Sequence, residues 1–462
     1  MPEQLLLLEF NEINFADVEY YCNLGLLPNF TSLFAKNGWA KTLSEDRYEE
    51  LEPWIQWVTA HTGKCLAEHG VFRLGDIVSR ELPQIWEQLE ELGYRVGALS
   101  PMNAKHRLRN PAFFVPDPWT ETGLTAGRTL RGLHSAIAQA VNDNAQSRLT
   151  AHSAWQLLWG FVAYSKIAHG PAYLRLLSTA WRFPWRRAIL LDLLLADVFL
   201  TEVERTKPDF ATLFLNAGAH VQHHYLFSAA CYQGAQRNPA WYVSGGVDPV
   251  RDAYHTYDVI LGAIRRTFPA ARIMIATALH QVPHGAGTFY WRLRRHADFL
   301  KRIRVPFASV QPRMSRDFLV ICESAEQARM AEERLSAAIC PAGSRIFSVD
   351  NRGTDLFVVL EYPSDIAAGV DFRIHDDTYR ISKDDVVFVA LKNGEHSGTG
   401  YFADTGARIR TDSDTFPLAE LPRKIMNALG IETALTSGNS IGNAACGASA
   451  AARDTDQVPG RR

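Results

Sequence analysis

The stretch Leu213–His224, LFLNAGAHVQHH, constrains the fold of this chain most strongly. It begins as an apolar run that is typical of a buried strand, passes through small residues and ends in three histidines. Strands of an open parallel sheet present functional groups at their carboxyl ends, which is where Asn216 and His220 would lie. Because a neutral imidazole is the commonest nitrogen ligand for zinc, the stretch indicates either a metal site or a cluster of surface histidines.

The length and the net charge of the chain restrict its fold and its possible partners. The chain has 462 residues, of which 47% are hydrophobic and 21% are charged, so it can bury a large core as one α/β domain with insertions or as two domains. The formal net charge is -2, and no overall field draws the protein to nucleic acid. We therefore expect no nucleic-acid partner, and any anionic ligand must be held by a local site.

Three features bear on the compartment. The amino-terminal run LLLLEF meets Glu9 after a few apolar residues, which is typical of a buried strand and not of a signal peptide. The longest uncharged segment, 149–165, is interrupted by polar residues and is slightly short for a membrane crossing. Six cysteines without paired spacing favour free thiols in a reducing environment. We expect a cytoplasmic protein without a transmembrane segment.

Apolar runs and amphipathic segments alternate along much of the chain, as they do in βαβ units. This pattern predicts an α/β fold with a doubly wound, mostly parallel sheet. The predicted strands are Leu5–Phe10, Tyr94–Ser100, Phe210–Leu215, Ala271–Thr277 and Val386–Leu391, and the predicted helices include Asn29–Asn37, Leu82–Leu92 and Asp252–Phe268.

Changes in pattern divide the chain into a core and two insertions. Long segments rich in Trp, Leu and Arg predict a helical cap, and a strand, a helix and a hairpin with its turn at Asn351–Thr354 predict a smaller α+β insertion. The loss of apolar periodicity near the end predicts a disordered tail. The predicted parts are core 1–102, helical cap 103–205, core 206–284, α+β insertion 285–384, core 385–433 and tail 434–462.

The tryptophans and leucines of the helical cap are expected to pack in the core, with a substrate wall or a membrane-facing surface as the alternatives. Arg182, Arg186 and Arg187 form a basic cluster in the same region. They could meet a phosphate or lipid head group, although a solvated helix face is the expected arrangement.

Six segments occur in a characteristic order between residues 5 and 410: GLLPNFTSLFAKNG after the first strand, WVTAHTGKCLAEHGV, IWEQLEELGYRVGALS, NAGAH, ATALHQ and GEHSGTGYFADTG. Together they resemble the alkaline phosphatase superfamily, in particular its type I phosphodiesterase and nucleotide pyrophosphatase branch and its sulfatase-like relatives. NAGAH resembles the family motif D-x-x-x-H with Asn in place of Asp, and ATALHQ stands where the family has S-D-H-G.

The resemblance implies an alkaline-phosphatase-like core in which two divalent ions clamp a phosphate or sulfate ester. It implies that Asn216, His220 and His396 hold one ion, and that Asn11 and His280 help to hold the other.

All three aspartates of the family pattern are replaced, by Asn11, Asn216 and Leu279. Neutral side chains would hold two divalent ions weakly. Nearby carboxylates could take their place, namely Glu9, Glu12, Glu49, Glu50 and Glu52.

The position of the family nucleophile is open. Counting back from Thr62 places it on Pro53, next to Glu52. A small insertion could move it to Thr42, Ser44 or Thr59, or Glu52 could have become a metal ligand, which we favour because it would complete one site. We take Glu52 and Thr59 as the candidate catalytic residues. The remaining histidines near the motifs are expected to be structural or exposed: His61, His69, His223, His224 and His284.

The function that follows is a metal-dependent hydrolase of a phosphate or sulfate ester, whose substrate is a small molecule, a glycan or a lipid. Zinc is the expected ion, with manganese or iron as alternatives. Two other functions stay open. The chain could bind a phosphorylated ligand without turning it over, or hold iron or manganese for other chemistry in a site rebuilt from histidine and glutamate.

Overall fold

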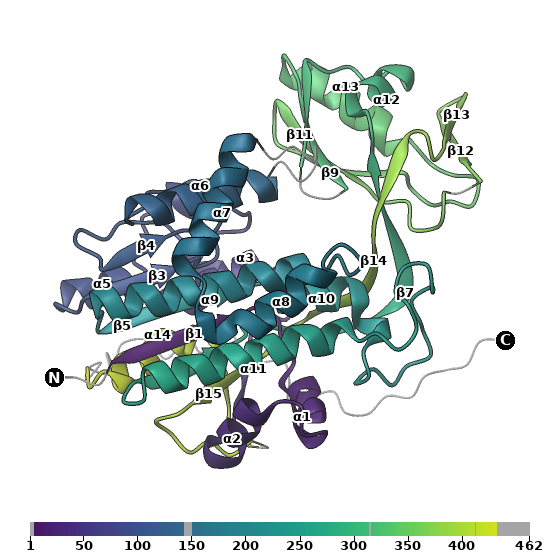
Figure 1. Cartoon of the computed structure of the whole chain (residues 1–462). Helices are drawn as coiled ribbons and strands as arrows, with labels where there is room; N and C mark the ends of the chain where they lie inside the picture. The colour runs from purple at the N-terminus through teal and green to yellow at the C-terminus, as the bar shows by residue number, and fades with distance from the viewer. Residues whose placement is uncertain (1–3, 143–149, 314–315, 367, 412, 432–462) are drawn as a thin grey trace.

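The computed structural model describes residues 4–142, 150–313, 316–366, 368–411 and 413–431. Its centre is an eight-stranded sheet in the order β16-β2-β15-β6-β1-β5-β3-β4 (Figure 1). Every strand except β15 runs in the same direction. The strands are β1 (Leu5–Phe10), β2 (Ala40–Leu43), β3 (Val96–Leu99), β4 (Phe113–Val115), β5 (Phe210–Leu215), β6 (Arg272–Ala276), β15 (Thr399–Asp404) and β16 (Thr415–Pro417).

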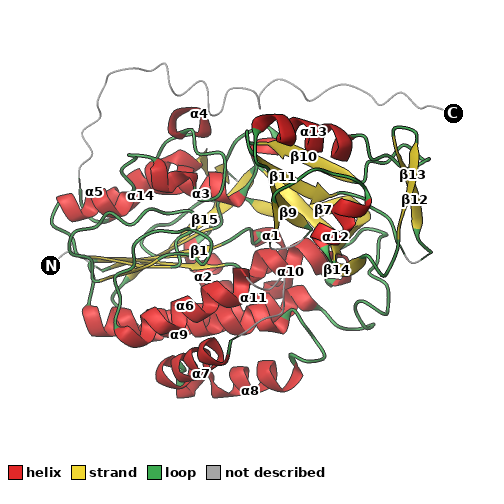
Figure 2. Ribbon diagram, turned by 90° about the horizontal axis from the view of Figure 1, so that it is seen from above, coloured by secondary structure: helices red, strands yellow, loops and turns green. Residues whose placement is uncertain are grey.

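Helices cover both faces of this sheet (Figure 2). Leu6, Leu8 and Phe10 of β1 pack into the core on one face, and Leu5 and Leu7 pack into the core on the other. The first face carries α1 (Phe15–Asn23), α2 (Pro28–Asn37), α6 (Arg128–Asn142), α9 (Arg186–Thr206), α10 (Ala217–Tyr225) and α11 (Pro249–Thr267), and the second carries α3 (Pro53–Thr62), α5 (Ile85–Glu91) and α14 (Leu421–Ala428), with α4 (Leu66–His69) outside them. Burial of β1 on both sides explains its apolar run, which only Glu9 interrupts. The predicted doubly wound α/β fold is confirmed.

The region predicted as a helical cap contributes to the main sheet, to the helices that cover the sheet, and to an outer layer of helices. β4 joins the edge of the main sheet, and α9 packs directly on the sheet. Two further helices, α7 (Ala151–Tyr164) and α8 (Gly170–Thr179), lie on the outer side of α9, away from the sheet (Figure 2). Gly160 lets α7 approach α6 closely, because a Cβ atom there would lie 2.7 Å from Leu133 Cδ1.

A long antiparallel ribbon, formed by β7 (His280–Leu293) and β14 (Val386–Ser397), leaves the core and carries the second insertion (Figure 1). The insertion contains a four-stranded antiparallel sheet, β10-β11-β9-β8, and a separate hairpin. Its elements are α12 (His296–Arg302), β8 (Ser309–Pro312), β9 (Asp317–Ile321), α13 (Ala325–Ser336), β10 (Phe347–Asn351), β11 (Asp355–Leu360), β12 (Val370–Ile374) and β13 (Asp377–Ile381). The predicted hairpin turn lies between β10 and β11.

One expectation from the sequence is wrong, and another concerns residues that the structure does not describe. The prediction that Val386–Leu391 is a core strand is wrong, because these residues pair with β7 in the ribbon and Val387 and Val389 are exposed. The last core strand is β15, which pairs antiparallel with β6. The predicted tail, 434–462, lies outside the described residues.

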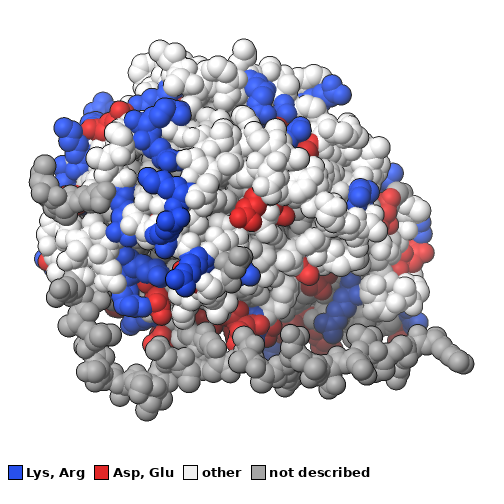
Figure 3. Space-filling model, turned by 90° about the horizontal axis from the view of Figure 1, so that it is seen from below, with Lys and Arg blue, Asp and Glu red and all other residues white. Residues whose placement is uncertain are grey.

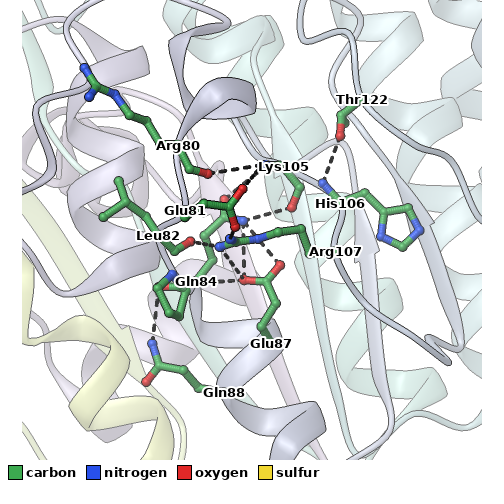
Figure 4. A network of polar contacts seen from close by, with 11 residues as sticks. Arg80, Glu81, Leu82, Gln84, Glu87, Gln88, Lys105, His106, Arg107 and Thr122 are labelled. Atoms are coloured by element: carbon green, nitrogen blue, oxygen red, sulfur yellow. Dashed lines mark hydrogen bonds and ion pairs between the residues drawn. The ribbon is translucent and has the colours of Figure 1, made fainter.

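A polar network fixes the start of α5 against the segment after β3 (Figure 4). Glu87 accepts a hydrogen bond from the Gln84 backbone at 2.6 Å, and Arg107 donates to the Leu82 carbonyl and pairs with Glu81 at 2.9 Å. The Glu87 carboxylate thus satisfies the backbone amide of Gln84, the residue that caps the helix, and Arg107 ties the segment before the helix in place. The helix therefore begins at Ile85, later than the sequence pattern predicts.

The surface charge is uneven although the net charge is small. In the face that Figure 3 shows, Lys and Arg side chains form a band along one side, and acidic side chains lie mainly elsewhere. Within the described ranges, no helix combines the length and the apolar character that a membrane crossing needs.

Candidate metal centre

The site begins where β1 ends. Glu12 has a left-handed backbone, with φ of 59°, and its amide donates to the Thr277 carbonyl at 3.2 Å. Ala278, at the carboxyl end of the neighbouring β6, is also left-handed, with φ of 58°. Such conformations cost about 1 kcal/mol or more for residues with a Cβ atom and gather at functional sites. The strained turn places Glu12 at the carboxyl edge of the sheet.

Two histidines from other elements meet the Glu12 carboxylate. His223 Nε2, from α10, lies 3.0 Å from Glu12 Oε2, and His396 Nε2, from β14, lies 3.3 Å from the same oxygen. The two Nε2 atoms are 3.2 Å apart. Three donor atoms from segments far apart in the sequence thus form a nearly equilateral triangle.

This triangle fits a divalent ion. Ligands at about 2.0–2.1 Å from a tetrahedral zinc are about 3.3 Å from one another, and the three separations here match that value. One carboxylate and two imidazoles are also a donor set that zinc, iron and manganese accept. Among the residues that the structure describes, no second group of three His, Cys, Asp or Glu side chains converges in this way. The geometry therefore suits one ion, whereas the family resemblance implied two.

Neighbouring amides hold the donors in place. Asn11 Nδ2 donates to Glu12 Oε1 at 3.0 Å, and Gln281 Nε2 approaches both Glu12 Oε2 and the His223 ring. Gln281 packs against Gly394, where a Cβ atom would lie 2.1 Å from its Oε1. Outer hydrogen bonds of this kind fix the orientation of ligands.

Glu12 and His396 shift each other's pKa values toward the charged forms. Burial by itself raises the pKa of Glu12, but the adjacent His396 and His223 lower it well below the ordinary value. For His396, burial lowers the pKa, and the Glu12 carboxylate outweighs burial and raises it. Glu12 is therefore a carboxylate, as a metal ligand must be.

Glu52 lies on the other side of the His396 ring. It precedes the first turn of α3, and its Oε2 is 3.8 Å from His396 Nδ1, whereas the donor triangle uses Nε2. Burial raises the pKa of Glu52 to about 6, with His396 opposing that shift. The side chain is thus placed to act on His396 electrostatically and to exchange a proton near neutral pH.

Asn11 and Asn216 lie together at the ends of β1 and β5. Asn11 Nδ2 donates to Asn216 Oδ1 at 2.8 Å, and Asn11 Oδ1 accepts from Trp57 Nε1 at 2.7 Å. The Asn11 amide therefore has partners on both sides. Its bonds link the two strands to α3 and support the neighbouring Glu12.

His220 and His280, the other sequence candidates, do not join the triangle. His220 is exposed on α10, with its ring centroid 5.1 Å from that of His224. His280 Nδ1 donates a hydrogen bond to the Thr399 carbonyl at 2.5 Å, and its ring packs near Tyr401. Because side chains alternate along a strand, His280 points away from the face on which Gln281 meets Glu12.

Thr59 is buried in α3, where its hydroxyl lies 3.2 Å from His69 Nε2. The Val71 amide donates to His69 Nδ1 at 2.9 Å, so the neutral ring carries its proton on Nε2 and donates to Thr59. This pair ties α3 to the end of α4. Thr59 thus has a structural partner and makes no hydrogen bond to Glu12, His223 or His396 within the described residues.

This pair predicts a loss of stability in acid. Burial lowers the pKa of His69 from 6.5 to about 4. As the pH falls from about 6.5 to about 4, the unfolded chain takes up a proton that the folded chain does not, which lowers the free energy of unfolding by up to about 3 kcal/mol. Urea unfolding at about pH 7 and pH 4.5 should show a fall that is about 2–3 kcal/mol smaller for His69→Gln. Equal falls in both proteins would refute the assignment.

Two residues of the donor triangle differ from the ligands that the sequence motifs implied. Glu12 lies one residue after Asn11, and His223 lies three residues after His220. His223 was expected to be structural, and Glu12 was one of several replacement carboxylates. Side chains alternate along β7, where Gln281 pairs with His396, and this alternation could have indicated that Gln281 faces the site. Such a prediction needs the register between β7 and β14. His396 belongs both to the ligand set that the sequence motifs implied and to the donor triangle of the structure.

Comparison with known proteins adds little to this geometry. No family model matches the chain, and no curated protein matches it. Solved structures similar to it include phosphonoacetate hydrolase from Sinorhizobium meliloti 1021 in complex with phosphonoformate, at 13% identity over 93% of this chain and 96% of that chain, with a TM-score of 0.42. Murine ectonucleotide pyrophosphatase/phosphodiesterase 5 has 10% identity over 96% of this chain and 99% of that chain, also with a TM-score of 0.42. At such values we take the chemistry from the side chains of this chain itself.

Proposed function

We propose that this protein is a metal-dependent hydrolase of phosphate or sulfate esters that uses one divalent ion. The observation that carries the proposal is the convergence of Glu12, His223 and His396, with separations that match the ligands of one ion. The ordered sequence motifs that resemble the alkaline phosphatase superfamily support the ester class. The site lies at the carboxyl edge of a parallel sheet, where α/β proteins bind their ligands.

Each residue has a defined part in this proposal. Glu12, His223 and His396 would hold the ion, which when bound supplies Lewis-acid polarisation of the ester and activation of water. Glu52, whose carboxylate lies 3.8 Å from His396 Nδ1, would attract the His396 ring electrostatically and, with a pKa of about 6, act as the proton acceptor or donor. Since Thr59 is directed to His69, water would be the nucleophile.

A second candidate function rests on the same donor set. Two histidines and one carboxylate on one side of an ion, with open positions opposite, are the ligands of non-haem iron enzymes. The site would then hold iron or manganese for a different reaction. The identity of the bound metal separates this candidate from a zinc hydrolase.

The test is turnover of an aryl phosphodiester and an aryl sulfate by the purified protein, before and after chelation and after return of zinc, manganese or iron. We expect one ion per chain and turnover that chelation abolishes. His223→Ala should lower turnover at least about 100-fold, and the matched variant His220→Ala should leave it nearly unchanged.

The remaining outcomes are also informative. Turnover that survives chelation would overturn the metal-dependent mechanism, and loss in His220→Ala with retention in His223→Ala would restore the ligand set implied by the sequence motifs. A bound ion without turnover of either ester would instead support a protein that binds its ligand without hydrolysing it.

A further inference from the structure

The outer face of α7 is apolar and faces solvent. Trp155, Leu158, Trp159 and Val162 follow the helical spacing i, i+3, i+4 and i+7, and each is between 54% and 64% exposed. The opposite face, which includes Gly160, packs against α6. A helix at the surface of a protein ordinarily presents a polar outer face, so α7 has a second apolar face that nothing in the described structure covers.

The same feature continues along the next segment. Ile167, Leu174, Leu177 and Trp181 are exposed, and the last three are spaced by three and four residues. Ile167 is 96% exposed and Trp181 is 78% exposed. Because α7 and α8 both lie on the outer side of α9 (Figure 2), these side chains belong to the outermost layer of the molecule. We call the exposed apolar side chains of residues 155–181 the outer apolar surface.

The segment that forms the outer apolar surface is basic in its own sequence, and its Lys166 pairs with Glu204 of α9 at 2.8 Å. Residues 150–191 contain five Lys or Arg and no Asp or Glu. Arg175 and Arg186 pair with Asp252 of α11, at 2.8 and 2.7 Å, and so anchor the segment to the core. Arg182 and Arg187 are exposed and follow Trp181 closely.

We propose that the outer apolar surface binds an anionic lipid bilayer, with α7 and α8 lying in the plane of the interface. Tryptophan is enriched at the boundary between lipid and water, and amphipathic helices with basic flanks bury their apolar side at that depth. Arg182 and Arg187 would meet lipid phosphates. A second copy seated on the same face would bring like charges together, whereas anionic head groups neutralise them. This inference goes beyond the proposed hydrolase and does not depend on it.

The experiment is co-sedimentation of the full-length protein with vesicles of phosphatidylcholine alone or mixed with an equal amount of phosphatidylglycerol. We expect binding to the mixed vesicles that weakens at high salt, and a blue shift of tryptophan fluorescence on binding. Trp159→Ser combined with Trp181→Ser should weaken binding about tenfold or more. Trp241→Ser is the matched control, since Trp241 is 65% exposed outside this surface, and it should bind as the original protein does.

A charge variant and the oligomeric state complete the test. Arg182→Gln combined with Arg187→Gln should weaken binding to the mixed vesicles and remove most of its salt dependence. All the substituted side chains are exposed, so thermal unfolding should be unchanged and a loss of binding cannot be assigned to misfolding. Failure of the original protein to bind either vesicle, or equal binding by the double tryptophan variant, would overturn the proposal. A dimer that dissociates in that variant would assign the surface to a second copy.

Discussion

Glu12→Gln is expected to lower the affinity for zinc by about 100- to 1,000-fold and to remove turnover in proportion. The substitution keeps the size of the side chain but removes the charge that faces both imidazoles in a fully buried position. A neutral amide cannot offset a divalent cation, and removal of one charged partner from a buried set costs about 3–5 kcal/mol. Isothermal titration calorimetry with zinc measures the affinity directly.

Glu49→Gln is the matched control for this variant. Glu49 is another carboxylate near the sequence motifs, and its side chain is 63% exposed in a surface pair with Arg47. Surface pairs contribute little, so the zinc affinity and turnover of this variant should be close to those of the original protein. Equal zinc affinity in Glu12→Gln and the original protein would exclude the donor triangle as the metal site.

Asp197→Ala is expected to lower the free energy of unfolding by about 3–5 kcal/mol. Asp197 is buried in α9, where its carboxylate meets His169 Nδ1 at 2.6 Å, the Tyr173 hydroxyl at 2.8 Å and the Lys166 amide at 2.7 Å. Removal of the carboxylate leaves these donors buried without an acceptor. Because they lie at and just before α8, the change should loosen the outermost helical layer.

Urea unfolding followed by circular dichroism measures this loss. Asp298→Ala is the control, because Asp298 is 65% exposed and pairs with Arg295 at the surface, so its loss should stay within about 0.5 kcal/mol. Hydrogen exchange should show faster exchange in residues 166–179 of Asp197→Ala than in the original protein. A loss of less than about 1 kcal/mol, with unchanged exchange, would show that the carboxylate does not hold this layer.

Local sequence was sufficient for the elements that build the core. The largely apolar strands β1 and β5, interrupted by Glu9 and Thr212, lie at the predicted positions, because both faces of a parallel strand are covered by helices. The helix predicted over Asn29–Asn37 is α2, with Pro28 at its first position and Gly38, at φ of 69°, after its end. Where the pattern was ambiguous, as for Val386–Leu391, an apolar run did not distinguish a core strand from the ribbon.

The sequence by itself determined the α/β class and the carboxyl edge as the location of the polar residues, and it predicted His396, which lies in the donor triangle. The tertiary structure decided which neighbour of each candidate joins it: Glu12 instead of Asn11, His223 instead of His220, and Gln281 instead of His280. A shift of one residue reverses the face of a strand, and three residues on a helix turn a side chain by about 60°. The positive φ at Glu12 and the register of the β7–β14 ribbon set these directions, and both depend on contacts between segments far apart in the chain.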